Sequence, residues 1–222
     1  MNIAENIISI KKKLPEKVRL VAVSKTKPNE DILEAYNAGH KIFGENKVQD
    51  LVGKYEQLPK DIEWHFIGHP QTNKVKYIAP FIGLIHGVDS IKLLKIINKE
   101  ARKNNRKIRC LLQFHIAEEK TKFGLTLEEA REILVSAEFK SLTNIIVSGV
   151  MGMATYTENE EQIRNEFKML NLIFNTLKNE YFSSVKNFSE ISMGMSDDYP
   201  VAVEEGSTLI RVGSKIFGER NY

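Results

Sequence analysis

The sequence is poor in the features that mark secreted, membrane and nucleic acid-binding proteins. It has a single cysteine, Cys110, so no disulfide can form within the chain. No stretch approaches the roughly 18 consecutive apolar residues of a membrane span, and residues 1–6 do not resemble a signal peptide. The 32 basic and 29 acidic residues nearly balance, at a net charge of +3, and no basic run is interleaved with aromatic residues. We therefore expect a cytoplasmic protein without a membrane or nucleic acid partner.

The sequence also lacks a pattern that predicts a metal site or a reactive thiol. Cys110 lies among apolar residues and is predicted to be a buried core thiol rather than a nucleophile. His69, His86 and His115 fall in three different segments without metal-ligand spacing. His65 lies inside a predicted strand and is interpreted as a packed, hydrogen-bonded core residue. No metal is expected.

What is present is an alternation of short apolar runs and segments with helical periodicity. This alternation predicts βα units and a parallel sheet, in a chain whose 42% hydrophobic content suits a globular core. A leading helix is predicted over residues 2–13. The predicted strands cover residues 19–25, 41–44, 62–67, 84–88, 107–116, 144–151, 188–193 and 208–212. The predicted helices between them lie between Pro28 and Gly39 and over residues 48–58, 74–81, 90–104, 126–139, 159–180 and 199–205.

Eight such units in about 200 residues match a small (β/α)8 barrel. An open doubly wound sheet is the alternative, but that fold would normally have fewer strands and a G-x-G-x-x-G phosphate fingerprint, which this sequence lacks. No linker or low-complexity stretch divides the chain. We therefore predict one α/β domain over residues 1–222, a (β/α)8 TIM barrel with an additional N-terminal helix.

The first predicted strand ends in Lys25, at the rim where barrel enzymes carry their active sites. Partial burial disfavours an ammonium ion, lowers its pKa and makes the amine a nucleophile. Such an amine forms Schiff bases with aldehydes and ketones. The alternative is a lysine whose charged end extends from the strand into solvent.

The last two strands end in loops rich in glycine and serine, which predicts a phosphate site. Gly194 and Gly213 would let backbone N–H groups approach an anion, and Ser196 and Ser214 would add hydroxyl donors. Loops in these positions frequently bind phosphate in barrels of this kind. The alternative for residues 196–198 is the capping of a helix.

Arg211 is predicted to be buried in the last strand and so needs a partner. That partner is either a carboxylate, such as Glu190 or Asp89, or a ring nitrogen or carboxylate of a ligand. A reactive lysine, a phosphate site and an arginine together describe pyridoxal 5′-phosphate. An arginine facing the pyridine nitrogen would leave that nitrogen unprotonated and the ring a weak electron sink. Asn46 is a candidate for the ring hydroxyl or, alternatively, a helix cap.

Several motifs spread over the chain form a specific combination. They are VAVSK (21–25), FGEN (43–46), WHFIG (64–68), ISMGMSDD (191–198), EEGST (204–208), RVGS (211–214) and IFG (216–218). This combination resembles the pyridoxal phosphate homeostasis protein family, also known as the YggS/PROSC family, over essentially the whole chain. That family is in turn similar to the N-terminal barrel of alanine racemase and of the fold-type III decarboxylases.

The resemblance implies a barrel of pyridoxal phosphate fold type III. It implies Lys25 as the lysine that forms the Schiff base, Ser196, Gly213 and Ser214 around the phosphate, Arg211 near the pyridine nitrogen and Asn46 near the ring. This sequence departs from the pattern at Ser214, where threonine is expected. It also has His69-Pro70 where Leu-Gln or a similar pair is usual, and Gly87 where serine is usual.

Three functions are compatible with this pattern. The first is a non-catalytic protein of pyridoxal phosphate homeostasis, which holds the cofactor on Lys25 and passes it to apo-enzymes that depend on it. The second is an amino-acid racemase or decarboxylase of fold type III, and the third is an aldolase that uses Lys25 without a cofactor. The relatives that racemise carry a second β-domain, and here the sequence ends at Tyr222, directly after the eighth unit. We therefore expect the first function, in a monomer.

Overall fold

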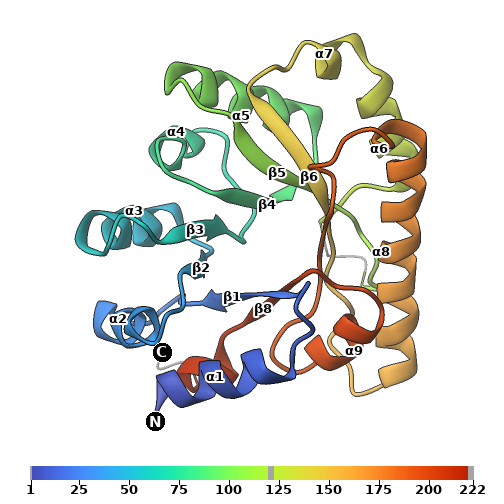
Figure 1. The fold of residues 1–222 in the computed structure, drawn as a ribbon. Coiled ribbons are helices and arrows are strands. Elements are labelled where there is room, and N and C mark those ends of the chain that lie inside the picture. Colours follow the sequence, from blue (N-terminus) through green and yellow to red (C-terminus); the bar gives the residue numbers. More distant parts are fainter. Residues whose placement is uncertain (1, 120–122, 220–222) are drawn as a thin grey trace.

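The computed structural model describes residues 2–119 and 123–219, and within them eight parallel strands close into a barrel (Figure 1). The strands follow one another around the barrel in chain order, and β1 pairs with β8 to close it. They are β1 (Arg19–Val23), β2 (Ile42–Glu45), β3 (Glu63–Phe66), β4 (Leu84–Val88), β5 (Ile108–Gln113), β6 (Ile145–Met151), β7 (Glu190–Ser192) and β8 (Leu209–Val212). The predicted (β/α)8 TIM barrel is confirmed.

Helices surround this barrel and connect its strands, as the alternating pattern predicts. They are α1 (Ile3–Lys13), α2 (Asn29–Asn37), α3 (Val48–Gln57), α4 (Val75–Ile78), α5 (Ile91–Lys103), α6 (Leu127–Val135), α7 (Ala137–Lys140), α8 (Glu160–Tyr181), α9 (Tyr199–Glu204) and α10 (Ser214–Phe217). The additional N-terminal helix is α1. Its terminal Lys11, Lys12 and Lys13 form the basic last turn that suits a helix C-terminus.

Two predicted helices differ from those in the structure. The helix expected over residues 126–139 is interrupted at Ser136, whose extended backbone ends α6 and whose side chain caps α7 by accepting the N–H of Phe139. The helix expected over residues 74–81 is reduced to the single turn of α4, because Pro80 has no N–H to continue it.

The helix α1 ties the beginning of the described chain to its end. Glu34 on α2 accepts the backbone N–H of Ile3 at 2.8 Å, and the Asn6 side chain donates to the carbonyl of Ile216 at 3.0 Å. The α1 helix thus packs against both α2 and α10, next to the closure of the barrel (Figure 1).

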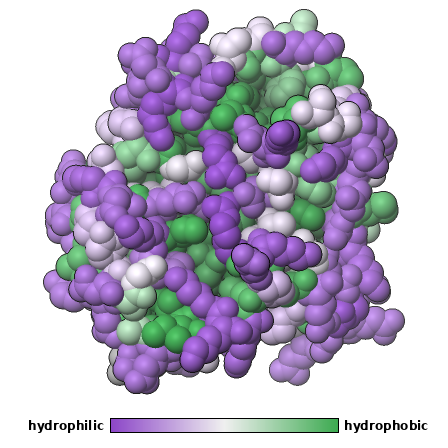
Figure 2. All heavy atoms as spheres, viewed as in Figure 1, coloured by the Kyte–Doolittle hydropathy of each residue, from purple (hydrophilic) through white to green (hydrophobic). Residues whose placement is uncertain are grey.

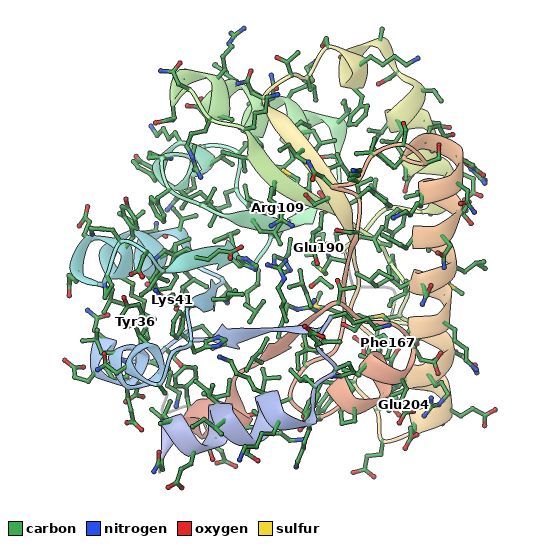
Figure 3. All side chains as sticks on the ribbon, viewed as in Figure 1. Tyr36, Lys41, Arg109, Phe167, Glu190 and Glu204 are labelled. Carbon is green, nitrogen blue, oxygen red and sulfur yellow. The ribbon has the colours of Figure 1, made fainter. Side chains whose placement is uncertain are left out.

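The interior of the barrel is not uniformly apolar. At the N-terminal ends of the strands, Arg19, Glu63, Arg109 and Glu190 project inward from β1, β3, β5 and β7, a layer contributed by alternate strands. Figure 3 shows Arg109 beside Glu190 near the middle of the barrel. Glu190 Oε1 lies 2.6 Å from Arg19 Nη2 and 2.9 Å from Arg109 Nη2, so this end of the barrel is closed by ion pairs.

Apolar and polar side chains fill the rest of the barrel above this layer. An inner apolar cluster includes Val21, Leu84 and Leu209, separate from the larger cluster that lies between the strands and the helices. His65 is fully buried and hydrogen-bonded, as predicted. Cys110 is also fully buried, and burial raises the pKa of its thiol to about 12, so the predicted core thiol is confirmed.

Several large hydrophobic side chains are exposed on the surface, among them Tyr156 and Leu172. Figure 2 shows hydrophilic side chains over much of one face, with hydrophobic residues in broken patches between them. In the part of the chain that the structure describes, none of the helices is long and apolar enough to cross a bilayer.

We predict that His40 makes the protein sensitive to acid. This residue is only 2% exposed, its Nε2 is bonded to the carbonyl of Ile42, and burial lowers its pKa to about 4. His40 is therefore protonated at a higher pH in the unfolded chain than in the folded chain. As the pH falls from 6.5 toward 4, protonation stabilises the unfolded chain first, and the unfolding free energy decreases. Between about pH 7 and about pH 4.5, the wild type should lose about 2–3 kcal/mol more unfolding free energy than His40→Gln.

Urea titrations of both proteins at several pH values measure this difference. Equal slopes of stability against pH in the two proteins would show that His40 is not held neutral.

Candidate functional site

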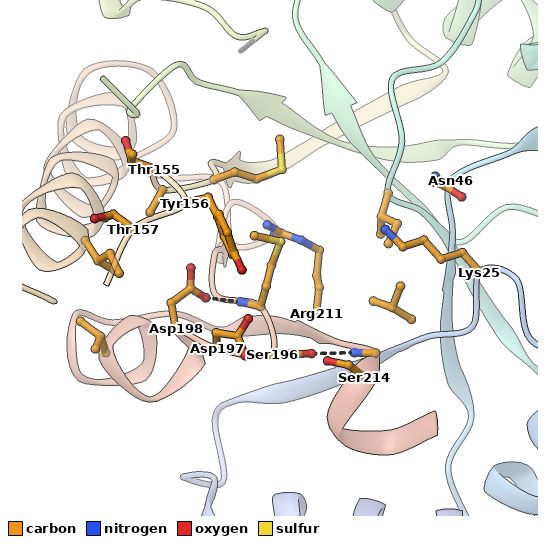
Figure 4. Close-up of a pocket in the computed structure, with 18 of the residues that line it drawn as sticks. Lys25, Asn46, Thr155, Tyr156, Thr157, Ser196, Asp197, Asp198, Arg211 and Ser214 are labelled. Atoms are coloured by element: carbon orange, nitrogen blue, oxygen red, sulfur yellow. Dashed lines mark hydrogen bonds between the residues drawn. The ribbon is translucent and has the colours of Figure 1, made fainter. Parts of the chain in front are cut away.

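All six residues predicted to bind a cofactor line one pocket at the C-terminal ends of the strands. The pocket has a volume of about 700 Å³, within the range typical of small-molecule sites. Its walls include Lys25, Asn46, Ser196, Arg211, Gly213 and Ser214 (Figure 4). The structure brings these residues together because β1 pairs with β8, so that the loops after the first and last strands are neighbours.

Lys25 is presented by a tight turn that begins where β1 ends. The N–H of Lys27 donates to the carbonyl of Ser24 at 3.1 Å, which closes a four-residue turn around Lys25. Thr26, the third residue of this turn, has a φ of 66°, a conformation that costs a non-glycine residue of the order of 1–2 kcal/mol. Neighbouring contacts must therefore hold the turn in place.

A buried ion pair under the turn provides those contacts. Lys54, on α3, donates to the Ser24 carbonyl at 2.8 Å and to Glu45 Oε1 at 2.7 Å. The Ser24 hydroxyl donates to the same carboxylate oxygen at 2.7 Å. Burial raises the pKa of Glu45, an effect that the charge of Lys54 opposes. This pair could not be predicted from the sequence, because a lysine in a helix that follows a strand is ordinarily a surface residue.

Arg211 lies at the floor of the pocket and is 4% exposed. Its guanidinium donates through Nη1 to the hydroxyl of Ser192 and through Nη2 to the carbonyl of Gly152 at 3.2 Å. Neither carboxylate considered from the sequence is its partner, because Glu190 binds Arg19 and Arg109 while Asp89 lies 3.3 Å from His69. Burial lowers the pKa of Arg211 to about 10, so the residue stays positively charged at neutral pH.

The loops after β7 and β8 meet at the other wall of the pocket. The backbone N–H of Gly213 donates to Ser196 Oγ at 3.2 Å, and Ser214 begins the one-turn helix α10 (Figure 4). The alternative for residues 196–198, the capping of a helix, holds for Asp198, which is the N-cap residue of α9 but makes no capping hydrogen bond with its side chain. Asp198 instead accepts the N–H of Met195 at 2.5 Å and thereby shapes the loop that carries Ser196.

Gly194 is required by the shape of the loop that follows β7, and it is not among the residues that line the pocket. Its φ of 93° is strained for other residues, and a Cβ there would lie 2.6 Å from the Cβ of Ala202. The residue therefore allows the β7 loop to turn and α9 to pack closely against it.

Asn46 lines the pocket and is not the cap of the next helix, because the N-cap of α3 is Lys47. A further wall of the pocket, residues 155–157 after β6, was not singled out from the sequence. Thr155 is fixed there by the buried Glu166, which accepts its N–H at 2.6 Å and its hydroxyl at 2.7 Å, whereas Tyr156 is 88% exposed. The position of this segment after the end of a predicted strand was the signal that could have identified it.

Two of the residues at which the sequence departs from the family pattern, His69 and Gly87, are not among the residues that line the pocket. The ring of His69 stacks on Phe123 and its Nδ1 lies 3.3 Å from Asp89. A Cβ on Gly87 would lie 2.6 Å from the carbonyl oxygen of Gly68, which is itself a pocket residue. Within residues 2–119 and 123–219 there is no cluster of three or more side chains that could hold a metal ion.

The chemistry of the pocket matches a phosphorylated aromatic aldehyde. Lys25 supplies an amine, and Arg211 supplies a fixed positive charge that donates hydrogen bonds to a ring nitrogen or an anion. Ser196 and Ser214 supply hydroxyl groups beside the start of a helix, a combination suited to phosphate. Val23 and Ile67 give the pocket apolar surface on which a ring can pack.

Comparisons with known proteins agree with this chemistry. A family model described as the alanine racemase N-terminal domain matches residues 1–221. A pyridoxal phosphate homeostasis protein of Aquifex aeolicus is 43% identical over 206 residues, which cover 92% of this chain and 88% of the relative. The structure of PipY from Synechococcus elongatus without PLP has a TM-score of 0.91 and 33% identity, covering 97% of this chain and 100% of PipY, and a second PipY structure has PLP bound.

The similarity extends to a true racemase only at the level of the fold. Alanine racemase from Clostridium difficile has a TM-score of 0.77 at 15% identity, and the match covers all of this chain but 60% of the racemase.

We predict that breaking the Lys54–Glu45 pair destabilises the protein strongly. In Lys54→Met the Glu45 carboxylate stays buried without its counter-charge, which should cost about 3–5 kcal/mol of unfolding free energy. The double variant Lys54→Met/Glu45→Gln removes that charge and should lose clearly less than the single variant. Urea unfolding at neutral pH measures all three proteins. A double variant as unstable as Lys54→Met would contradict this account.

Proposed function

Because this chain belongs to the family of pyridoxal phosphate homeostasis proteins, we propose that it holds pyridoxal 5′-phosphate on Lys25 and takes part in the intracellular homeostasis of that cofactor. The observation that carries the proposal is the convergence of the Lys25 amine, the buried Arg211 guanidinium and the Ser196 and Ser214 hydroxyls on one pocket. The family relationship supplies the cofactor, and the pocket supplies groups for each part of it.

Each group has a separate task in this proposal. When bound, pyridoxal phosphate supplies an aldehyde that forms a Schiff base with an amine, and Lys25 is the amine that we assign to it. Ser196, Ser214 and the backbone of Gly213 would hold the phosphate. Arg211 would face the pyridine nitrogen, and Asn46 would lie near the ring.

The same arrangement supports storage of the cofactor rather than catalysis. Arg211, which stays charged at neutral pH, would keep a ring nitrogen beside it unprotonated, and this weakens the ring as an acceptor of electrons. The ion pair under Ser24 holds the backbone of the lysine turn, which suits a fixed attachment point. We propose that the protein is not an enzyme and that residues 1–222 act as one cofactor-binding domain.

The wider setting of this function is also part of the proposal. A protein that buffers a reactive aldehyde would act in the cytoplasm and pass the cofactor to apo-enzymes that depend on it. The buried thiol of Cys110 is compatible with a reducing compartment. The closed barrel, whose strands all have two neighbours, supports a monomer.

We predict that Lys25→Ala abolishes covalent attachment of pyridoxal phosphate. Wild-type protein incubated with the cofactor and then desalted should retain a visible absorbance band, and reduction of the imine with borohydride should remove that band while making the added mass permanent. Lys25→Ala should lose both the band and the added mass, because the other amine that lines the pocket, that of Lys27, is held by the carbonyls of Phe217 and Glu219. Lys92→Ala, at an exposed position on α5 away from the pocket, is the matched control and should behave as wild type.

A mass spectrum of the reduced protein distinguishes the outcomes. Cofactor mass on Lys25→Ala, or its absence from the wild type, would refute the assignment.

We further predict that the loaded protein does not turn over amino acids at a useful rate. With alanine in deuterium oxide, exchange at Cα should be no faster than with an equal concentration of free pyridoxal phosphate, because the ring is a weak electron sink. Proton NMR of alanine follows the exchange. Exchange that is fast in the wild type and lost in Lys25→Ala would support the racemase alternative instead.

A further inference from the structure

A buried chain of hydrogen bonds runs through the barrel from the pocket toward its opposite end. Arg211 donates to the hydroxyl of Ser192, whose Oγ lies 2.9 Å from Nδ1 of His86. Nε2 of His86 lies 3.0 Å from Nδ1 of His65, and Nε2 of His65 lies 2.9 Å from Oε1 of Glu63. The four residues from Arg211 to His65 are at most 4% exposed. Neither histidine has a part in the cofactor-binding roles proposed above, and Glu63 otherwise belongs to the ion-pair layer that closes the barrel.

The groups at the two ends of this chain of hydrogen bonds, Arg211 and Glu63, determine which atom donates in each of them. An ionised carboxylate only accepts, so Nε2 of His65 carries a proton and donates to Glu63. A neutral His65 then accepts at Nδ1, which requires His86 to donate from Nε2 and accept at Nδ1. The Ser192 hydroxyl donates to His86, and its oxygen accepts from Arg211, which can only donate. Each hydrogen bond points from the pocket toward Glu63.

The charges around the chain favour this single arrangement. Arg19 on β1 and Arg109 on β5 lie 3.9 and 4.0 Å from Glu63 Oε1, and both also bind Glu190 on β7. The hydrogen bond from His65, helped by these two arginines, lowers the pKa of Glu63 and keeps it ionised. Burial lowers the pKa of both His65 and His86, and the positive charges of Arg19 and Arg109 add to that effect at both rings. Arg211 adds to it at His86, whereas the hydrogen bond to Glu63 opposes it at His65.

We propose that Ser192, His86 and His65 are positioning residues that fix the Arg211 guanidinium toward the pocket, with Glu63 setting the direction of the chain. Two of the five N–H donors of Arg211 are committed to Ser192 and Gly152, which sets the plane of the guanidinium and the edge that it offers to a ligand. A group at the N-terminal end of the barrel thus influences the floor of the pocket. The inference rests on the proposed function only in taking that ligand to be pyridoxal phosphate.

The first test needs no cofactor. In ¹⁵N NMR spectra of the histidine-labelled protein at neutral pH, His65 and His86 should both be neutral and protonated at Nε2, because burial lowers the pKa of each ring below its ordinary value. The two rings are assigned with His65→Gln and His86→Gln. A charged ring, or a proton on Nδ1 of either ring, would overturn the direction that the chain requires.

The second test measures how tightly the cofactor binds and where the bound cofactor absorbs. In His86→Leu and Ser192→Ala the chain is broken, and the dissociation constant for pyridoxal phosphate should rise about tenfold, the effect of one lost buried hydrogen bond. The absorbance maximum of the bound cofactor should shift, because Arg211 is no longer fixed at the ring. His86→Gln, which can accept from Ser192 and donate to His65, should restore both toward wild type. His40→Gln is the control, a buried histidine outside the chain.

The outcomes separate this inference from the proposed function. If folded His86→Leu and Ser192→Ala bind the cofactor with the wild-type constant and spectrum, the positioning role is wrong while the function stands. If the wild type itself takes up no cofactor, the proposed function fails, and the NMR measurement still decides the direction of the chain. If His86→Leu does not fold, Ser192→Ala, which removes only a hydroxyl, gives the answer.

Discussion

The pairing of β1 with β8 is the contact on which the rest of the structure depends. Four residues of β1 are in register with four of β8, including Val21 with Arg211. This pairing places the turn around Lys25 next to the loop that begins α10. Without it, the amine and the phosphate-type donors would lie at opposite edges of an open sheet. The site is therefore a product of ring closure, and every contact that stabilises the closure also shapes the pocket.

Polar and apolar side chains occupy different levels along the barrel axis. The layer of Arg19, Glu63, Arg109 and Glu190 closes one end with ion pairs, and the pocket opens at the other. Between them, apolar side chains share the interior with His65, His86 and Ser192, which are buried but fully paired. Burying polar groups is costly unless each has a partner, so such an interior specifies one arrangement of side chains.

The sequence was sufficient to predict the barrel and six of the residues that line the pocket, because both follow from local signals. Lys25, Arg211 and Ser214 each lie on or just after a strand, and counting the strands brings them together. The contacts beneath them could not be predicted in this way. His86 and Ser192 are 106 residues apart, and their meeting depends on the register of β4 and β7 and on which side chains point inward. Lys54 carries no local sign that it is buried under Ser24, since only the packing of α3 determines this.

The hydrogen bond between Asn6 and Ile216, which are 210 residues apart, has a consequence for how the protein folds. Contacts between distant parts of a chain form slowly, because a long loop must close first. The docking of α1 on α2 spans only about 30 residues and can precede it. Until β8 has been synthesised, one edge of β1 has no partner strand, and α1 can pack against α2 but not yet against α10. A ligand that contacts the loops on both sides of the β1–β8 pairing binds only the closed barrel. Its free concentration therefore shifts the equilibrium between the open and the closed chain.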